Sequence, residues 1–171
     1  METARLVTRF LTKKDEEIWT RFLKNEDCTR YFPKTDFASP VERARYWIEK
    51  QINRYKEEKY GLQALVSKET GAFVGQCGLL LQEVDGKKEL EVGYHILREY
   101  WGRGYAPEAA QAFIKYGAEN SDFDSIISII HRENKNSIAV ALKNGLRKEK
   151  ETTWFDLPVS IYRINKDDIF F

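Results

Sequence analysis

The pattern of hydrophobic and polar residues predicts strands at both ends of the chain and in its middle. Apolar and polar side chains alternate over residues 3–11, which suits an opening strand with both faces at least partly covered. The turn signals Glu69-Thr70-Gly71 and Asp85-Gly86 separate later apolar runs, so we expect hairpins there. The predicted strands cover residues 3–11, 62–67, 73–81, 89–97, 125–131, 146–153 and 159–164.

Apolar residues recur at helical spacing in residues 13–25, 41–59, 107–119 and 136–144. Thr12 and Ser39 are expected N-caps, Pro107 suits a first helical turn, and Gly145 closes the last helix. Residues 28–40 contain two prolines and are predicted to form a loop. The order β-α-α-β-β-β-α-β-α-β-β indicates a mixed α/β fold.

The length of 171 residues fits one domain, residues 1–171, without a Ser/Gly-rich linker or an internal repeat. Lys and Arg (28) balance Asp and Glu (27), giving a net charge of +1, so no global field attracts nucleic acid or an anionic membrane. No apolar run reaches the roughly 20 residues of a membrane span, and the N-terminus lacks a signal-peptide pattern. We therefore expect a cytoplasmic protein.

Cysteine and histidine patterns do not indicate a metal site. Cys28 and Cys77 lie too far apart in sequence to form a metal-binding pair, and we expect both to be reduced, packed thiols. Neither His95 nor His131 has a second ligand at metal-site spacing, so each is expected to be an ordinary strand residue. No metal cofactor is expected.

Residues 100–109, between a predicted strand and a predicted helix, carry the clearest chemical pattern. Gly102 and Gly104 lack a Cβ atom, so the backbone can approach a ligand closely and aim its N–H groups at a phosphate. Arg103 could add a screened contact. A Gly-x-Gly turn that merely joins strand to helix remains the alternative, and the spacing matches neither a dinucleotide fingerprint nor a P-loop.

Five blocks in this order resemble the GNAT superfamily of N-acetyltransferases, in particular its RimJ/RimL-like branch, whose founding members acetylate the N-termini of ribosomal proteins. The blocks are Glu2-Thr3-Ala4-Arg5-Leu6-Val7-Thr8-Arg9, Gly75-Gln76-Cys77-Gly78, Glu91-Val92-Gly93-Tyr94-His95-Ile96, Tyr100-Trp101-Gly102-Arg103-Gly104-Tyr105-Ala106-Pro107-Glu108-Ala109 and Asn134-Lys135-Asn136-Ser137-Ile138. The resemblance implies a mostly antiparallel sheet that splays between its fourth and fifth strands, and a single GNAT domain.

The resemblance also implies that acetyl-coenzyme A is the co-substrate and that its pantetheine arm lies in the splayed gap. Backbone groups at the end of the fourth strand would pair with the pantetheine amides, and the turn amides would bind the pyrophosphate. The implied coenzyme-binding residues are His95, Ile96, Leu97, Trp101, Gly102, Arg103, Gly104, Tyr105, Ala106, Asn134 and Ser137.

Two positions depart from the general GNAT pattern. Trp101 stands where the signature Gln/Arg-x-x-Gly-x-Gly/Ala begins, while Gly104 and Ala106 match its end. An aromatic residue at the first position is usual in the RimJ/RimL-like branch. Ala141 occupies the position of the tyrosine that serves many relatives as general acid.

Amine acetylation requires a neutral amine, a polarised thioester carbonyl and a proton for the leaving thiolate. Glu91 is the candidate general base, acting through a water, although a solvent-facing strand carboxylate is the alternative. Ser137 is the candidate proton donor to sulfur, or a helix-start residue that bonds its own backbone. Asn134 could cap that helix, bind the pantetheine arm, or do both.

The acceptor side is less determined. Tyr31, Phe32, Trp47 and Trp154 could line the acceptor pocket or could equally be core residues. The branch resemblance favours a protein N-terminus as the acceptor, with a small-molecule amine (antibiotic, polyamine or amino acid) as the alternative. A coenzyme-binding sensor or interaction module without transfer is the competing hypothesis. The tail Ile169-Phe170-Phe171 could form a homodimer contact or tuck against its own sheet.

Overall fold

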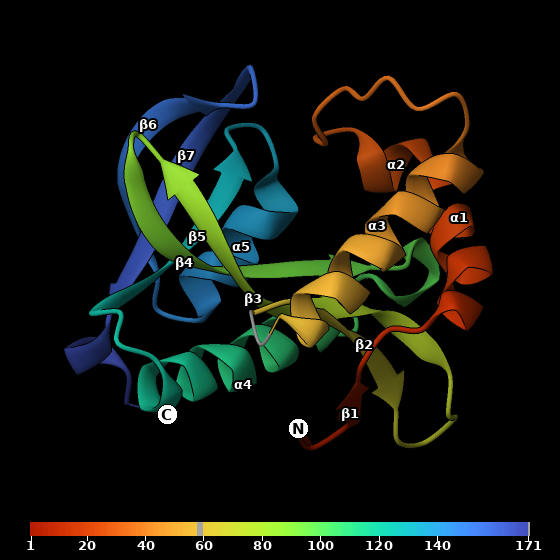
Figure 1. The fold of residues 1–171 in the computed structure, drawn as a ribbon. Helices are drawn as coiled ribbons and strands as arrows, with labels where there is room; N and C mark the ends of the chain where they lie inside the picture. The colour runs from red at the N-terminus through yellow and green to blue at the C-terminus, as the bar shows by residue number, and fades with distance from the viewer. Residues whose placement is uncertain (58–59, 171) are drawn as a thin grey trace.

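A computed structural model describes residues 1–57 and 60–170. Its centre is a seven-stranded sheet in the order β1-β2-β3-β4-β5-β7-β6 (Figure 1). The strands are β1 (Leu6–Arg9), β2 (Leu62–Ser67), β3 (Phe73–Val84), β4 (Lys87–Ile96), β5 (Ser125–His131), β6 (Arg147–Trp154) and β7 (Leu157–Asn165). The α/β fold expected from the sequence is confirmed.

The sheet splays at one place, between β4 and β5. All other neighbouring strands pair antiparallel, whereas β4 and β5 run parallel and share the single register pair Glu91 and Ile127. Beyond Glu91 the two strands separate, so β4 presents a free edge toward its end at Ile96. This splayed, mostly antiparallel sheet is the one that the family resemblance implied.

Helices cover both faces of the sheet. They are α1 (Glu16–Lys24), α2 (Glu26–Thr29), α3 (Pro40–Lys56), α4 (Tyr105–Asn120) and α5 (Lys135–Lys143). The first three lie together on one face, and α4 runs along the opposite one (Figure 1). Phe113 and Ile114 of α4 pack on one side of the sheet, and Trp19 of α1 and Ile48 of α3 pack on the other. Each such side chain stabilises the fold by roughly 1.5–3 kcal/mol.

Local capping explains where the helices begin. Ser39 accepts a hydrogen bond from the Glu42 amide, as expected of an N-cap before Pro40. The predicted helix over residues 13–25 is interrupted, because Asp15 accepts the Thr12 amide and holds a 3-10 turn before α1. The predicted end of the second helix at positions 58 and 59 lies outside the described residues.

Two other expectations are corrected. The opening strand is shorter than residues 3–11, because the chain leaves the sheet after Arg9 and Phe10 is largely exposed. The predicted loop over 28–40 starts inside a short helix, α2, which Asn25 caps by accepting the Asp27 amide. None of the described helices is both long and apolar enough to cross a bilayer.

Candidate functional site

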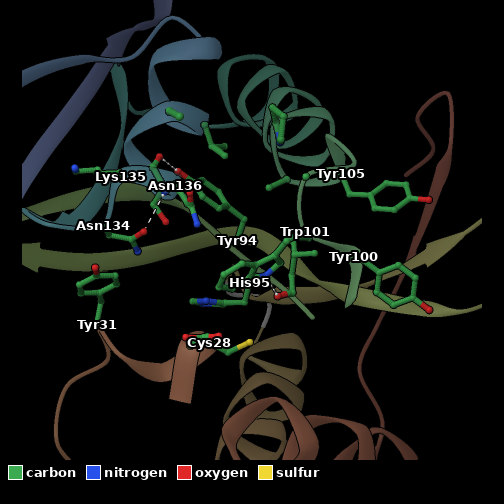
Figure 2. Close-up of a pocket in the computed structure, with 18 of the residues that line it drawn as sticks. Cys28, Tyr31, Tyr94, His95, Tyr100, Trp101, Tyr105, Asn134, Lys135 and Asn136 are labelled. Atoms are coloured by element: carbon green, nitrogen blue, oxygen red, sulfur yellow. Dashed lines mark hydrogen bonds between the residues drawn. The ribbon is translucent and has the colours of Figure 1, made fainter. Parts of the chain in front are cut away.

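The structure encloses a cavity of about 600 Å³ where β4 and β5 diverge (Figure 2). Residues 94–96 of β4 form one wall, and the turn over 100–107 forms another. Further lining comes from residues 133–137, 139, 140 and 143 in and before α5, and from residues 22, 27, 28 and 30–32 around α2. The volume is typical of small-molecule sites, which span roughly 300–1,000 Å³.

The turn before α4 is held in a conformation that only glycine adopts easily. Gly102 and Gly104 have φ angles of +75° and +77°, and Gly104 is the N-cap of α4. A Cβ atom at Gly102 would meet nothing within 4 Å, so protein packing does not require glycine there. Among the described residues, the amides of Gly102, Arg103, Tyr105 and Ala106 have no acceptor. These donors, at the positive end of a helix, form a suitable site for a phosphate.

Side chains from the N-terminal segment hold this turn. Arg5 donates to the Arg103 carbonyl at 2.8 Å and pairs with Glu108 of α4 at 2.6 Å. Thr3 donates to the same Glu108 carboxylate at 2.6 Å. The Arg103 side chain lies over the Tyr100 ring and outside the cavity lining. Its carbonyl, rather than its guanidinium, therefore connects to the rest of the fold.

The edge of β4 alternates between bonded and free backbone groups. The Leu97 amide donates to the Val74 carbonyl of β3 at 3.0 Å. Because bonded residues alternate along an antiparallel strand, the backbone groups of Leu97, His95 and Gly93 face β3. Tyr94 and Ile96 consequently direct their backbone groups into the gap. Trp101 already donates to the Ile96 carbonyl at 2.7 Å, which ties the turn to the strand end. The free edge of β4 is therefore formed by Tyr94 and the Ile96 amide, while Leu97 is buried outside the cavity.

Tyr94 is a site residue that the sequence analysis did not single out. Its hydroxyl donates to the Ser137 carbonyl at 2.9 Å, so it connects β4 with α5 across the gap (Figure 2). Burial raises its pKa. The signal available in the sequence was its place in Glu91-Val92-Gly93-Tyr94, because alternation along a strand puts Tyr94 and Glu91 on opposite faces of the sheet.

The start of α5 supplies two polar groups to the cavity. The Asn134 side chain accepts the Ser137 amide at 3.2 Å, which confirms its capping role. The Ser137 hydroxyl, by contrast, has no hydrogen-bond partner within residues 1–57 and 60–170. Ser137 is partly buried and lines the cavity, so its hydroxyl is available to a ligand.

Aromatic side chains surround His95, which lies on the face of β4 opposite to that of Tyr94. The rings of Trp19, Phe22, Phe32 and Trp47 approach its ring edge-on, with centroids 5.2–6.1 Å away. Burial lowers the pKa of His95 to about 4, so its imidazole is neutral at physiological pH. The side chain lines the cavity and has no hydrogen bond to any described residue.

Glu91 lies at the fork of the sheet and is buried, with 8% of its surface exposed. It accepts hydrogen bonds from Gln82 Nε2 at 2.7 Å and from the Ile129 amide at 3.4 Å. Burial raises its pKa to about 7, against the lowering effects of these bonds and of the Arg54 charge. The solvent-facing alternative is therefore wrong. Glu91 is outside the cavity lining, four residues along β4 from His95, or roughly 13 Å.

Of the four aromatic candidates for the acceptor pocket, the cavity includes two. Tyr31 and Phe32 line it, and Tyr31 stacks on His131 with centroids 4.8 Å apart. Trp47 lies behind Phe32 and donates to Gln76 Oε1 at 2.9 Å. Trp154 packs near Val84, Ile127 and Val159 at the far hairpin, away from the cavity lining.

The thiols and carboxylates give no further candidates. Cys77 is fully buried and Cys28 lines the cavity, and neither forms a disulfide. Burial raises the pKa of Cys28 to about 11, so it is a thiol near neutral pH. In the described part of the chain, no cluster of three or more His, Cys, Asp or Glu residues could hold a metal ion.

Comparisons with known proteins place the chain among acyl-transferring proteins. The model of the family described as "Acetyltransferase (GNAT) domain" matches residues 5–147. YkkB of Bacillus subtilis, an uncharacterised protein, is 35% identical over 163 residues, covering 94% of this chain and 92% of YkkB. The uncharacterised N-acetyltransferase p20 of Bacillus licheniformis is 30% identical over 150 residues, covering 87% and 82%.

Solved structures share the fold at lower identity. A GNAT acetyltransferase from Bacillus anthracis superimposes with a TM-score of 0.79 at 24% identity, covering 98% of both chains. Ribosomal-protein-S5-alanine acetyltransferase from Vibrio fischeri gives 0.77 at 17% identity, covering 99% and 98%. Spermidine N-acetyltransferase from Vibrio cholerae, in complex with CoA and spermine, gives 0.75 at 15% identity, covering 96% and 97%.

Proposed function

The chain belongs to the acetyltransferase (GNAT) domain family and is an acyltransferase, and we propose that it moves the acetyl group of acetyl-coenzyme A to a primary amine. The observation that carries this proposal is the pair of left-handed glycines before α4, with free amides beside the open edge of β4. Both features border one cavity. One domain, residues 1–171, would carry the whole site.

The residues present suit the chemical groups of the coenzyme. Free amides at the start of α4 would hold the pyrophosphate. The Tyr94 backbone and the Ile96 amide would pair with pantetheine amides as an added strand does, because none of the described strands occupies that edge. Lys135 and Lys143 line the same cavity and would add positive charge near the phosphates.

The thioester supplies an acyl carbon that a neutral amine can attack directly. The N–C bond forms, the C–S bond breaks, and the electron pair of that bond leaves with sulfur. The nitrogen then loses one proton and the sulfur gains one, so one base and one acid balance the reaction. No enzyme nucleophile takes part. His95 offers no charge to an ammonium at this place, because its ring is neutral at physiological pH.

Glu91 is the proposed base. A carboxyl pKa near 7 suits proton abstraction at neutral pH. The cavity wall at His95 is roughly 13 Å away along the strand, so the proton would reach Glu91 through water. Gly93 lies between the two on this face of the sheet, and the Leu62 and Leu80 side chains come within 3.4 Å of the position that a Cβ atom would take there.

Ser137 is the proposed proton donor to the leaving sulfur. Its hydroxyl lies at the cavity wall without a protein acceptor, and Asn134 fixes the backbone on which it sits. Ala141, where many relatives have a tyrosine, is buried with 1% of its surface exposed and cannot supply a proton. Solvent would then restore the hydroxyl proton after each turnover.

For the acceptor, the structure likeness to an S5-alanine acetyltransferase supports the RimJ/RimL-like branch and a protein N-terminus. The spermidine enzyme of similar fold supports a small amine to the same degree. Release of free thiol from acetyl-coenzyme A, screened against N-terminal peptides and small amines, tests the proposal. Acceptor-dependent release is expected; coenzyme binding without release from any acceptor would point to the sensor instead.

A further inference from the structure

A row of cations follows one side of α3. Arg43, Trp47, Lys50 and Arg54 are separated by four, three and four residues, so they lie on one side of the helix. Trp47 contacts Gln76 and His95 near the end of β4. Arg54, two turns further, is close enough to Glu91 for each charge to shift the pKa of the other. The row therefore runs antiparallel to β4, from the cavity wall to the proposed base.

Within the described residues, these cations have no carboxylate as an ion-pair partner. Arg43 donates to the Pro33 carbonyl at 3.3 Å and lies over Phe32, and Arg54 donates to Gln51 at 3.4 Å. Among the described residues, Lys50 has the Tyr46 ring as its contact, with the ring centroid 5.9 Å from its Nζ atom. None of the three forms an ion pair with any described residue, and burial lowers the pKa of each.

Other arginines of this protein show the contrast. Arg163 pairs with Glu89 at 2.8 Å and Arg9 pairs with Asp15 at 2.7 Å, and both carboxylates are largely buried. Partial burial of a cation without a partner costs free energy, which a bound anion offsets. Arg54 is partly buried and Lys50, one turn away, is exposed, so together they offer an anion two cations that form no ion pair with a described residue.

The sheet opposite the row adds little negative charge. Gly78 and Gly93 are cross-strand partners there and carry no side chains. The nearest carboxyl on this face is Glu91, which is committed to Gln82 and Ile129. A substrate that approaches from the side of α3 therefore passes beside Arg54 and Lys50, neither of which forms an ion pair with a described residue.

We propose that Arg54 and Lys50 bind an acidic group of the acceptor, so that the preferred substrates are amines that also carry a carboxylate or a phosphate. This inference rests on the proposed transfer to an amine and narrows its substrate class. A planar guanidinium binds either anion through two parallel hydrogen bonds. Polyamines without an acidic group are disfavoured, because like charges repel at this surface.

Three dipeptides with amidated C-termini, Ala-Glu, Ala-Gln and Ala-Lys, isolate the effect of charge at constant length. Thiol release from saturating acetyl-coenzyme A gives kcat/KM for each. We expect Ala-Glu to exceed Ala-Gln by roughly tenfold or more, as for one charge-assisted hydrogen bond, and Ala-Lys to be poorest. Phosphoethanolamine and ethanolamine are compared in the same way to test a phosphate group. The acidic substrate with the larger kcat/KM relative to its neutral counterpart, Ala-Glu or phosphoethanolamine, identifies the preferred anion.

Variants of the cationic residues of α3 test whether these residues cause the preference for an acidic acceptor. Arg54→Met and Lys50→Met should each reduce the Ala-Glu advantage, and Arg54→Glu should make Ala-Lys the better substrate. Arg45→Met is the matched control, since Arg45 lies on another side of α3 and pairs with Glu16 at 3.7 Å. It should keep the wild-type order. Acetyl-coenzyme A titration of every variant separates a lost preference from a lost fold.

The outcomes distinguish this inference from the function beneath it. Equal rates for the three dipeptides, a preference for Ala-Lys, or no turnover of any acidic acceptor by coenzyme-binding wild type overturns the acidic-acceptor inference. Unchanged preference in Arg54→Glu also overturns it, because the row would then not contact the acceptor. Failure of the wild type to bind acetyl-coenzyme A contradicts the proposed function instead.

Discussion

Glu91 of β4 faces Ile127 of β5 at the single register pair that joins these parallel strands. On one side of this pair the sheet is closed; on the other it opens into the cavity. The buried carboxyl therefore lies at the point where the sheet divides. Burial of this carboxyl gives Glu91 its raised pKa.

Replacing Glu91 with glutamine should remove the base and retain the shape. The wild-type kcat should rise with pH through an inflection near 7, because the carboxylate must be deprotonated to accept a proton. Glu91→Gln should lower kcat by about 10²–10⁴-fold and abolish the inflection, with coenzyme affinity unchanged. A pH-rate profile of Glu91→Gln that keeps the wild-type inflection would remove Glu91 from the mechanism.

The same substitution, Glu91→Gln, should raise the free energy of unfolding at pH 8, although it lowers kcat. The Glu91 pKa is about 7 in the fold and near 4.5 when unfolded, so the native state binds more protons between these values. The contribution of this group to stability is therefore lost as pH rises from about 4.5 to 7. Urea unfolding should show Glu91→Gln more stable than wild type at pH 8, on the order of 2–3 kcal/mol, with no gain at pH 4.

Glu89, two residues earlier on β4, provides the matched control. Its ion pair with Arg163 lowers its pKa, so its contribution is present above the unfolded pKa and is lost on acidification. Glu89→Gln should be less stable than wild type at pH 8. If both glutamine variants shift stability in the same direction at pH 8, the assigned burial of Glu91 is wrong.

Tyr94 should hold α5 against β4 through its hydroxyl. Tyr94→Phe removes the bond to the Ser137 carbonyl and should cost about 1 kcal/mol of unfolding free energy. Because that bond also places the start of α5, the KM for acetyl-coenzyme A should rise. Tyr116→Phe, at an exposed position on α4, should change neither quantity. Equal effects of the two variants would argue against a bridging role.

Substitutions at Ser137 and Asn134 should distinguish a loss of catalysis from a loss of helix capping. Ser137→Ala should lower kcat while leaving stability near wild type, because its hydroxyl has no acceptor among the described residues. Asn134→Ala should cost about 1 kcal/mol, since it removes the N-cap of α5. Thiol-release kinetics and thermal unfolding of both variants provide the test. Unchanged kcat in Ser137→Ala would exclude it as the proton donor.

The sequence predicted those features that depend on local pattern. The buried strand at Ser125–His131 has the predicted bounds, because its apolar run is flanked by clear turn signals. Gly102 and Gly104 were identified by their spacing, and both have the positive φ that requires glycine.

Other features depend on tertiary packing and could not be predicted in this way. Whether Glu91 met solvent depended on Gln82 and Ile129, from two other strands. Trp154 and Trp47 are aromatic like Tyr31, yet only packing determines which of them reaches the cavity. The Tyr94 bond to α5 joins residues 43 apart in the chain, and no periodicity encodes such a contact.

The central claim, that the glycine turn binds the coenzyme, is tested most directly by calorimetric titration with acetyl-coenzyme A. Wild type, Gly104→Val and Gly86→Val should be compared, because Gly86 has a similar φ of +76° in a hairpin away from the cavity. Both substitutions strain the backbone by about 1–2 kcal/mol, so general destabilisation is matched. We predict that Gly104→Val weakens binding by tenfold or more while Gly86→Val retains wild-type affinity. Wild-type affinity in Gly104→Val, or no binding by the wild type, would contradict the account.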